Sequence, residues 1–533
     1  MIDAGDARPN IILILTDDQG YGDLACHDNP VIRTPNLDRL HAEGVCFRHF
    51  HASPVCSPTR ASLMTGRYNF RTGAIDTYLG RSMMHPDEVT LPELLGAHGY
   101  RTGIFGKWHL GDNYPMRAMD KGFQEALVHN GGGLAQPSGR PGDGYFDPVL
   151  SHNGVWAKHS GYCTDIFTSA AIAFIARHRA EPFFVYLATN APHMPLQVAD
   201  EYSGRYLAMG LDEETAKTYA MITNIDDNVG RLLASLKELG LERNTIVIFL
   251  TDNGPAVSRG VDRFNAGLRD LKGSVYDGGI RVPCFLRWPA RLQAGREIDE
   301  MAAHIDLLPT LLDACGAPLP DGLRLDGISL LPLLLGAAAP WPERTLYFQW
   351  HRGDEPEPYR NCCARSDRYK LVNGTELYDL IADPGEQRDI AADHPEIVAR
   401  MRAGYEAWIE DVSATRGYAP PRIHLGTLHE NPVTLTRQDW RGAEGWGNEH
   451  LGYWEVKVAT AGEYDITLRF SARLPAREAH FRLGDNSLSQ ALDEGATACV
   501  FQRVPLPAGD ARLEAWLEAD GRRRGVSYVD VKR

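Results

Sequence analysis

The sequence NIILILTDD, residues 10–18, is the stretch that decides the fold. Five consecutive apolar residues occupy positions 11–15, and two acidic residues follow at 17 and 18. A continuous apolar run of this length is typical of a strand buried on both faces of a parallel sheet, because a half-exposed strand would alternate apolar and polar residues. We therefore expect an internal strand with Asp17 and Asp18 at its carboxyl end.

Three further segments repeat this plan of an apolar run followed by polar or imidazole side chains. The runs and the residues behind them are 100–106 before Lys107 and His109, 182–188 before His193, and 245–250 before Asp252 and Asn253. Helix-like segments at 164–177 and 212–239 lie between them, and Gly240 is a suitable helix stop. This alternation predicts an α/β core with a mostly parallel sheet. Since ligands in such folds bind beyond the carboxyl ends of the strands, we expect the four polar clusters to converge.

The pattern changes after about residue 340. Short extended runs and one long helix follow, at 345–350, 369–372, 376–379 and about 395–412. Beyond Pro420 and Pro421, apolar residues alternate with polar ones as in half-buried strands, for example at Tyr464, Ile466, Leu468 and Phe470. We expect three parts: an α/β domain at 8–340, a smaller α+β subdomain at 341–424 and a small β-sandwich at 425–533.

Length and composition limit the classes of protein that the chain can belong to. At 533 residues it exceeds what one hydrophobic core usually supports. The apolar fraction of 43% and the charged fraction of 23% are typical of globular proteins. The net charge of −15 argues against a nucleic-acid-binding protein. It does not exclude an anionic substrate, because local cations and a metal outweigh the overall field.

Two further features bear on the compartment. No stretch approaches the roughly 20 apolar residues that span a bilayer, and residues 1–6 lack the basic and apolar regions of a signal peptide. We therefore expect no membrane partner, and a cytoplasmic protein if Met1 is the native start; a trimmed signal peptide would instead imply a periplasmic or extracellular one. Nine dispersed cysteines without metal-type spacing indicate mostly free, buried thiols.

One cysteine is set apart by the residues that follow it. The sequence CSPTRASLMTGR at 56–67 resembles the formylglycine signature of type I sulfatases, in which a modifying enzyme reads the cysteine, the proline two places on and the arginine two further. A thiol packed ahead of a helix would explain Cys56 alone but not the whole stretch. The resemblance implies an alkaline-phosphatase-like α/β sandwich, a formylglycine-generating enzyme as maturation partner, and hydrolysis of sulfate esters.

Chemistry gives a reason for this modification. A thiolate that attacked sulfur would form a thiosulfate ester with no easy exit. An aldehyde hydrate supplies one hydroxyl as the nucleophile and a second whose deprotonation expels sulfate by carbon–oxygen cleavage. A position at the start of a helix would favour the negative charge that develops there.

The acidic residues behind two of the strands suggest a metal site. Asp17, Asp18, Asp252 and Asn253 offer oxygen donors and suit a hard cation. An isolated Asp-Asp or Asp-Asn-Gly sequence is more often a turn or a helix cap, but here two such pairs each follow an apolar run. The resemblance implies that these four residues, with the oxygen of the converted Cys56, hold one calcium ion.

Five basic or imidazole residues complete the expected site, all with roles implied by the resemblance. Lys107 and Lys272 would contact sulfate, and Arg60 would neutralise charge beside formylglycine. His109 would hold or deprotonate a formylglycine hydroxyl. His193 would protonate the departing alcohol.

Other polar or aromatic residues carry weaker expectations. We expect the cluster Asn224, Asp226, Asp227 and Asn228 to be structural, and assign no role to His304 and Asp306. His49 and His51 are hypothesised to line the pocket wall. A glycine-rich stretch at 129–147 is expected at the site mouth, which Trp350 and His351 could also reach. Trp440, Trp446 and Trp454 are expected to form the core of the last part, although sugar stacking is an alternative.

The resemblance leaves the alcohol portion of the substrate open, so we expect a sulfated small molecule or carbohydrate. One alternative is a phosphonate or phosphodiester hydrolase on the same scaffold. Another is a sulfated-glycan binding protein whose catalytic site has degenerated, although every expected catalytic position is filled.

Overall fold

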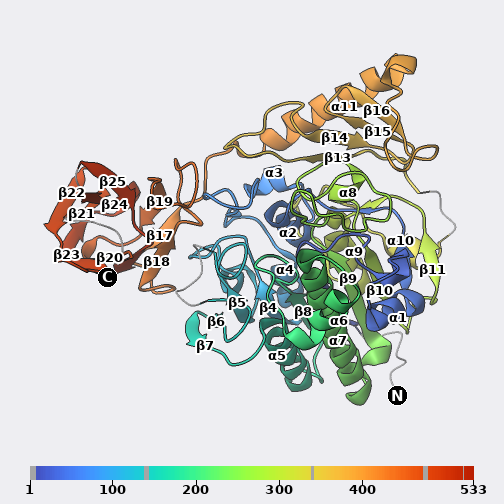
Figure 1. Cartoon of the computed structure of the whole chain (residues 1–533), viewed down its shortest axis with the longest axis horizontal. Helices are drawn as coiled ribbons and strands as arrows, with labels where there is room; N and C mark the ends of the chain where they lie inside the picture. Colours follow the sequence, from blue (N-terminus) through green and yellow to red (C-terminus); the bar gives the residue numbers. More distant parts are fainter. Residues whose placement is uncertain (1–7, 137–142, 338–340, 472–477, 520) are drawn as a thin grey trace.

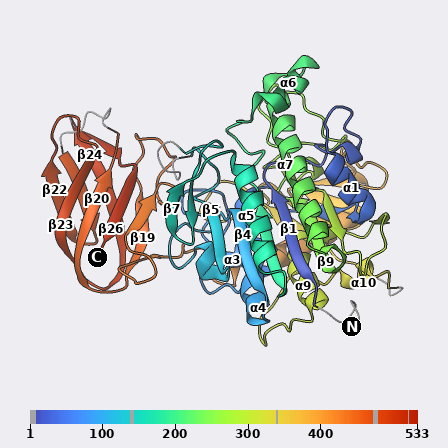
Figure 2. The ribbon, with the colours of Figure 1, turned by 90° about the horizontal axis from the view of Figure 1, so that it is seen from below.

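The computed structural model describes residues 8–136, 143–337, 341–471, 478–519 and 521–533. Its main body is a 10-stranded mixed sheet in the order β11-β2-β10-β9-β1-β8-β4-β5-β6-β7, covered by helices on both faces (Figures 1 and 2). The strands are β1 (Asn10–Thr16), β2 (Val45–Phe47), β4 (Arg101–Lys107), β5 (Glu125–His129), β6 (Val149–His152), β7 (Val155–Lys158), β8 (Phe183–Ala188), β9 (Thr245–Thr251), β10 (Cys284–Arg287) and β11 (Arg296–Ile298).

The four predicted apolar runs are adjacent strands at the centre of this sheet. β9, β1, β8 and β4 lie side by side and all run parallel, and all seven residues of β1 are buried. The outer strands β10, β6 and β7 are antiparallel to their neighbours, which makes the sheet mixed. The predicted α/β fold is confirmed; its large sheet is parallel at the centre and mixed overall, and the polar residues behind the four strands lie at one sheet edge.

Two hydrophobic cores enclose the sheet, one on each face. Ile12 and Ile14 of β1 pack on one side, whereas Ile11, Leu13 and Leu15 pack on the other. The first core includes α1 (Pro35–Glu43), α5 (Cys163–Arg177) and α7 (Glu213–Glu238), and the second α2 (Cys56–Thr65), α4 (Leu91–Ala97) and α9 (Leu307–Cys315). The shorter elements of the body are β3 (Phe50–His51), β12 (Ala302–Ala303), α3 (Asn69–Thr72), α6 (Asp200–Ala208), α8 (Asp277–Ile280) and α10 (Leu331–Leu334).

The polar cluster on α7 has the structural role that the sequence predicted. The Asp226 carboxylate accepts hydrogen bonds from the backbone N–H groups of Asn36 and Leu37 and so caps α1. Asn224 and Asn228 donate to Asp165 on α5. These contacts join three helices on one face of the sheet.

A second sheet lies across the main body, at the top of Figure 1. Its antiparallel strands are β13 (Leu346–Gln349), β14 (Cys362–Arg365), β15 (Tyr369–Val372) and β16 (Glu376–Asp379), and α11 (Pro395–Ser413) packs against them. Tyr405 and Trp408 of α11 share a core with Phe348 of β13. This sheet carries the segment after β13, which includes Trp350, toward the body.

The strands from β17 to β26 form a separate lobe, here called the C-terminal β unit (Figures 1 and 2). One of its sheets contains β17 (Ile423–Leu425), β19 (Tyr453–Val458), β24 (Gly509–Ala519), β21 (Glu478–Leu483), β22 (Asn486–Ala491) and β25 (Arg522–Gly525). The other contains β18 (Val433–Thr436), β26 (Tyr528–Lys532), β20 (Gly462–Arg469) and β23 (Ala498–Leu506). Both sheets share one core, in which Trp440 and Trp454 are fully buried. The prediction that these two tryptophans form the core of the C-terminal part is thus confirmed.

The C-terminal β unit is joined to the main body by polar contacts. Gly80 donates its backbone N–H to the carbonyl of Gln438 at 2.9 Å. The N–H of Tyr114 donates to Glu430 at 2.7 Å, and Asn113 donates to the carbonyl of Thr434 at 3.1 Å. Several of these groups are buried, so the contact surface is a fixed part of the structure.

One buried carboxylate at this contact predicts a pH-dependent stability. Asp439 is 1% exposed, and neither of its carboxylate oxygens has a hydrogen-bond partner among the described residues. Burial, together with neighbouring Asp112, raises the pKa of Asp439 well above its usual value. In the folded protein Asp439 therefore keeps a proton that it releases above about pH 4 in the unfolded chain. The free energy of unfolding should thus fall as the pH rises from about 4 toward the pKa of Asp439 in the folded protein.

We expect Asp439→Asn to remove most of this pH dependence. At pH 8 the variant should be more stable than the wild type by ~1–2 kcal/mol, since its neutral amide needs no proton to stay buried. Thermal unfolding at pH 5 and pH 8 measures the effect, with Glu444→Gln, an exposed carboxylate on the same loop, as control. Equal pH slopes in the variant and the wild type would contradict the assignment.

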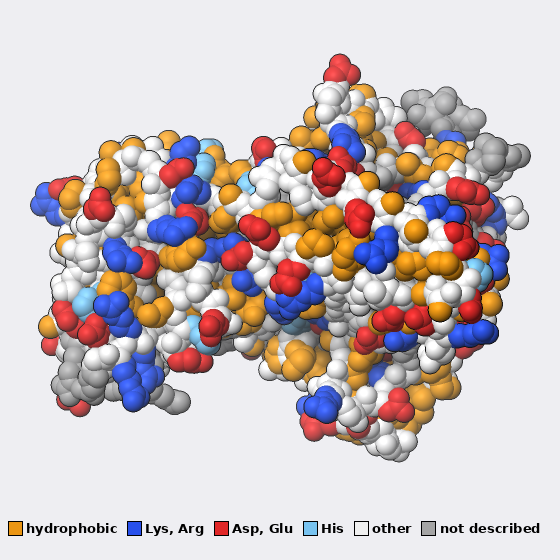
Figure 3. All heavy atoms as spheres, turned by 90° about the horizontal axis from the view of Figure 1, so that it is seen from above, with side chains coloured by type: hydrophobic (Ala, Val, Ile, Leu, Met, Phe, Trp, Pro, Cys, Tyr) orange, Lys and Arg blue, Asp and Glu red, His pale blue; other side chains and the backbone are white. Residues whose placement is uncertain are grey.

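Three general properties complete the description. All nine cysteines are unpaired, as expected. No helix among the described residues combines the length and apolar character that a membrane span requires. Acidic and basic side chains are interspersed on the face shown in Figure 3, where the negative charge does not gather in one patch.

Candidate functional site

The predicted site residues meet at the carboxyl edge of the central strands. Asp17 and Asp18 follow β1, Asp252 and Asn253 follow β9, and Lys107 is the last residue of β4. His193 lies in the segment after β8, and Cys56 begins α2. The structure therefore brings together side chains that are widely separated in the sequence.

Cys56 occupies the N-terminal end of a helix that is buried throughout. It is the first residue of α2, after Val55 in an extended conformation, and it is 2% exposed. Burial, with Asp17 and Asp252 nearby, raises the pKa of its thiol above the usual value, while Lys107 and Lys272 oppose this shift. Backbone N–H groups at a helix N-terminus favour an anion there.

Carboxylate oxygens surround Cys56. One atom each of Asp17, Cys56 and Asp252 lie within 4.8 Å of one another. The amide nitrogen of Asn253 donates to Asp18 Oδ1 at 2.9 Å, and the backbone N–H of Asp18 donates to Asp252 at 3.1 Å. Burial and neighbouring Asp17 raise the pKa of Asp252, although Arg60 opposes them. This is a closely packed group of oxygen ligands.

Two atoms of this group lack hydrogen bonds. Asp17 Oδ1 and Asn253 Oδ1 are buried and have no hydrogen-bond partner within the described ranges. A buried polar oxygen without a partner is costly, and a hard cation would satisfy both oxygens at once. The donor set therefore fits a calcium-type ion.

Three cations balance the three carboxylates. Lys107 Nζ lies 2.6 Å from Asp17 Oδ2, and Lys272 Nζ lies 2.5 Å from Asp18 Oδ1. Arg60 donates to Asp252 Oδ2 at 2.7 Å and to the carbonyl of Lys107 at 3.2 Å. Arg60 and Lys107 are fully buried behind the site, whereas Lys272 reaches the pocket. Adding a divalent cation would leave the site net positive and suited to an anion.

His109 is held as a neutral imidazole with one free nitrogen. Its backbone has a φ of 61°, and Nε2 lies 2.7 Å from the carbonyl of Thr77, which can only accept. The Nε2 atom therefore carries the proton. Nδ1 is buried without a hydrogen-bond partner among the described residues, and burial holds the pKa of His109 well below 6.5. This nitrogen is available to accept a proton.

His193 faces the same pocket from the segment after β8. Its Nδ1 lies 2.7 Å from the carbonyl of Met194, and its Nε2 lies 3.8 Å from Asp18 Oδ2. Burial lowers the pKa of His193 to about 4, although Asp18 opposes the shift. An anion bound beside the ring would raise this pKa.

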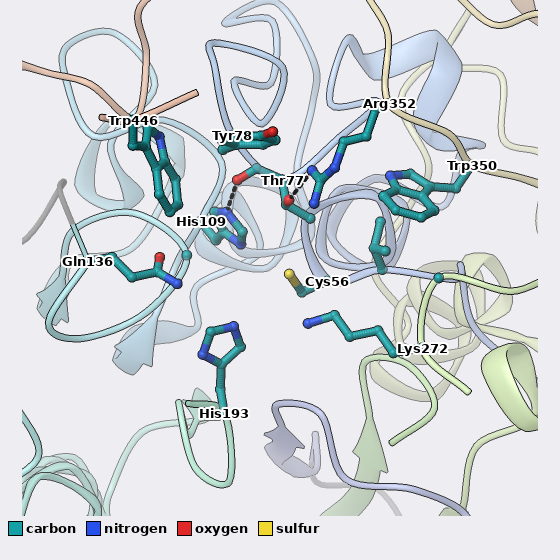
Figure 4. A pocket seen from close by; sticks show the side chains of 13 residues that line it. Cys56, Thr77, Tyr78, His109, Gln136, His193, Lys272, Trp350, Arg352 and Trp446 are labelled. Carbon is teal, nitrogen blue, oxygen red and sulfur yellow. Dashed lines mark hydrogen bonds between the residues drawn. The ribbon is translucent and has the colours of Figure 1, made fainter. Parts of the chain in front are cut away.

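These side chains open into a cavity of about 490 Å³. Figure 4 shows Cys56, His109, His193 and Lys272 directed at one space. Around them are Val55, Thr77, Tyr78, Gly132, Gln136, Gly273, Trp350, Arg352 and Trp446. A cavity of this size, with apolar walls and converging polar groups, is typical of a small-molecule site.

The secondary expectations have mixed outcomes. Gly132 and Gln136 confirm that the glycine-rich stretch reaches the pocket; its residues 137–142 lie outside the described ranges. Trp350 lines the cavity, but His351 does not, since its ring nitrogens bond to Arg352 and Glu357.

The hypothesis that His49 and His51 line the wall is wrong. Neither is among the residues around the cavity. His51 is fully buried in β3, and its ring nitrogens lie toward Ala302 and Asp277. His304 bonds to Ser53 and Asp306 pairs with Arg344, so both are structural.

Sequence patterns did not identify several residues of the site. Thr77, Tyr78 and Arg352 belong to no motif. Gln438 of the C-terminal β unit donates to the carbonyl of Thr77 at 2.9 Å and to Ser82 Oγ at 3.0 Å. It thus supports the same carbonyl that orients His109, a contact that only the folded chain reveals.

Comparisons with known proteins agree with this geometry. The Sulfatase family matches residues 9–317, and the family "N-sulphoglucosamine sulphohydrolase, C-terminal" matches residues 267–409. Human arylsulfatase A is 35% identical over 412 residues, 70% of this chain and 77% of that protein. The dog N-acetylgalactosamine-6-sulfatase is 32% identical over 65% of this chain and 69% of its own length.

Solved structures show the same likeness. Ps i-CgsB, determined in complex with k-i-k-neocarrahexaose, is 30% identical with a TM-score of 0.70, covering 77% of this chain and 95% of that one. A phosphonate monoester hydrolase of Agrobacterium radiobacter has a TM-score of 0.56 at 23% identity, over 76% of this chain and 96% of that one, and shares the fold.

Proposed function

Because the chain belongs to the sulfatase family, as a type I member of the alkaline-phosphatase superfamily and thus a sulfuric ester hydrolase, we propose that it cleaves aryl or carbohydrate sulfate monoesters through a formylglycine at position 56 and a calcium ion. One observation carries this proposal. A buried Cys56 at a helix N-terminus lies among Asp17 and Asp252 and opens into the cavity that His109, His193 and Lys272 also line.

The ligands proposed for calcium are Asp17, Asp18, residue 56, Asp252 and Asn253. Their support is the packed set of oxygen donors and the two buried oxygens that have no hydrogen-bond partner in the described part of the chain. When bound, the ion would polarise a sulfate oxygen and lower the pKa of the attacking hydroxyl. Around it, Lys107 and Arg60 hold the carboxylates in place through their ion pairs.

The first half of the reaction follows from the positions of residue 56, Lys272 and His193. Lys272 would hold the sulfate group as a point charge at the cavity floor. One hydroxyl of hydrated residue 56 gives its proton to the neighbouring Asp252 carboxylate and attacks sulfur, and the bond from sulfur to the alcohol oxygen breaks. His193 gives that oxygen a proton, after the bound anionic ester has raised the pKa of the imidazole from about 4.

The second half releases sulfate without a second attack on sulfur. The remaining hydroxyl of residue 56 loses its proton, the carbon–oxygen double bond of the aldehyde reforms, and the bond from carbon to the sulfate oxygen breaks. His109 Nδ1, which has no hydrogen-bond partner among the described residues, is the group we assign to accept that proton. Water then restores the hydrate.

The test combines mass spectrometry with a choice of substrates. Protein co-expressed with a formylglycine-generating enzyme should contain the aldehyde in the peptide that spans 49–60, and should turn over an aryl sulfate at least ~100-fold faster than an aryl phosphonate. An unmodified thiol in active protein would refute the mechanism. A preference for the phosphonate would favour the alternative hydrolase, whose fold the Agrobacterium enzyme shares, and binding of sulfated sugars without hydrolysis would favour a binding protein.

A further inference from the structure

The cavity has one wall that the catalytic proposal does not use. Trp446 lies in the loop between β18 and β19 and lines the cavity, although it belongs to the C-terminal β unit. Trp440 and Trp454 of the same unit are fully buried in its core, whereas Trp446 is only partly buried. In Figure 4, its ring lies beside His109 and Gln136, facing the space above Cys56.

The loop that carries Trp446 is held by a buried arginine. Arg437 is 5% exposed, and its guanidinium donates to the carbonyls of Trp446 and Val526 at 2.5 and 2.8 Å. It also donates to Asn448 at 2.5 Å. A buried cation is costly unless its donors are satisfied, and here they bond to the carbonyl of Trp446 itself and to Asn448, two residues further on. The backbone that carries the Trp446 ring is therefore held in place in advance of binding.

The neighbours of Trp446 form an aromatic mouth with polar groups. The rings of Trp446 and Tyr78 meet edge to face, with centroids 5.0 Å apart. The Arg352 guanidinium lies 4.4 Å from the Tyr78 ring centroid and 5.1 Å from that of Trp350, and its charge is paired with Asp76 at 2.6 Å. Because that charge is already compensated, the mouth offers flat apolar faces rather than a second anion site.

Unsatisfied hydrogen-bonding capacity lies next to these faces. Gln136 Oε1 is buried and has no hydrogen-bond partner among the described residues. Its side chain lies across the cavity mouth from Trp350, near Trp446 (Figure 4). Flat aromatic faces combined with free polar groups suit a sugar ring, which has apolar C–H faces and hydroxyl edges.

We propose that Trp446 and Tyr78 form the wall of a subsite for the sugar ring that carries the sulfate, so that the C-terminal β unit selects ring alcohols over acyclic ones. This inference rests on the proposed function, and it makes Trp446 a specificity-determining residue rather than a catalytic one. The ring occupies the mouth while its sulfate reaches Cys56 and Lys272 at the cavity floor.

The experiment compares ring and acyclic substrates in matched variants. Trp446→Ala should lower kcat/KM for hexose monosulfates by ~10-fold or more relative to ethyl sulfate, and Trp446→Phe should restore most of the loss. The control is Trp516→Ala, which removes a tryptophan of the same unit that stacks on His480. Thermal unfolding of the variants verifies that all are folded.

Failure of the inference can be distinguished from failure of the proposed function. If wild type hydrolyses sulfate esters and Trp446→Ala leaves the ratio of hexose sulfate to ethyl sulfate unchanged, the inference is overturned and the function stands. If aldehyde-bearing wild type hydrolyses no sulfate ester, the function fails. In that case the subsite is tested by calorimetry, which compares the binding of hexose monosulfates to Cys56→Ala protein and to the Cys56→Ala, Trp446→Ala double variant. Weaker binding to the double variant supports the subsite, and equal binding refutes it.

Discussion

Cys56→Ala is expected to reduce kcat/KM for an aryl sulfate by roughly 10⁴-fold or more, because it removes the proposed nucleophile, which is also the group proposed to release sulfate. The fold should persist, since alanine suits the first turn of a buried helix and the deleted sulfur faces the cavity. Steady-state kinetics with 4-nitrophenyl sulfate measures the effect, and circular dichroism verifies the fold.

Two comparisons make this result specific. Cys315→Ala removes another buried thiol, at the end of α9, and should keep nearly full activity. Wild-type protein made without a formylglycine-generating enzyme should be as inactive as Cys56→Ala, because its thiol cannot release sulfate. Full activity in either Cys56→Ala or the unmodified protein would mean that another residue is the nucleophile.

Asp17→Asn is expected to abolish calcium binding and to lower kcat by roughly 10³-fold or more. The substitution keeps the size of the side chain but removes one of the charges around the proposed ion. It also leaves Lys107, now 2.6 Å from a carboxylate oxygen, beside a neutral amide. Calcium per chain is measured by elemental analysis, and Tm with and without added calcium reports binding independently of activity.

Asp227→Asn is the matched control, because Asp227 is an exposed carboxylate on α7 that contacts Tyr202. It should keep the calcium content, the rise in Tm on calcium addition and the activity of wild type. An Asp17→Asn protein with unchanged calcium content and activity would place the ion elsewhere.

The central sheet could be predicted because its signals are local. Strands β1, β8 and β9 each contain a continuous apolar run, and β4 contains a shorter one around Ile104 and Phe105; burial on both faces is what such runs satisfy. Parallel neighbours place their carboxyl ends at one edge, so the convergence of Asp17, Lys107, His193 and Asp252 follows from the fold class.

The mouth of the cavity could not be predicted in the same way. Thr77, Tyr78, Arg352 and Gln438 lie in loops whose positions depend on how separate sheets dock, and no repeat or spacing marks them. The three tryptophans of the C-terminal β unit illustrate the limit. Trp440, Trp446 and Trp454 lie close together in the sequence, yet only contact with the body of the protein separates the two core residues from the one at the cavity.

The prediction that His49 and His51 line the cavity wall was wrong for a related reason. They precede Cys56 closely in the sequence, and sequence proximity suggested a shared pocket. The backbone instead pairs β3 with β12, and the His51 ring lies toward the Ala302 carbonyl and Asp277. Pairing with a strand distant in the sequence sets the direction of the side chain, so closeness along the chain does not place residues in one site.

The burial of Cys56 has a consequence for the order of events during synthesis. The residue is 2% exposed, and every residue of α2 is buried, including those that a maturation enzyme would read. Such an enzyme can reach this segment only while the chain is still unfolded. Strand β9, which pairs with β1 and brings Asp252 to the site, leaves the ribosome roughly 10–40 s after Cys56 at about 5–20 residues per second. If Cys56 is converted as proposed, translation speed therefore sets the time available for the conversion, and the closing of the sheet ends it.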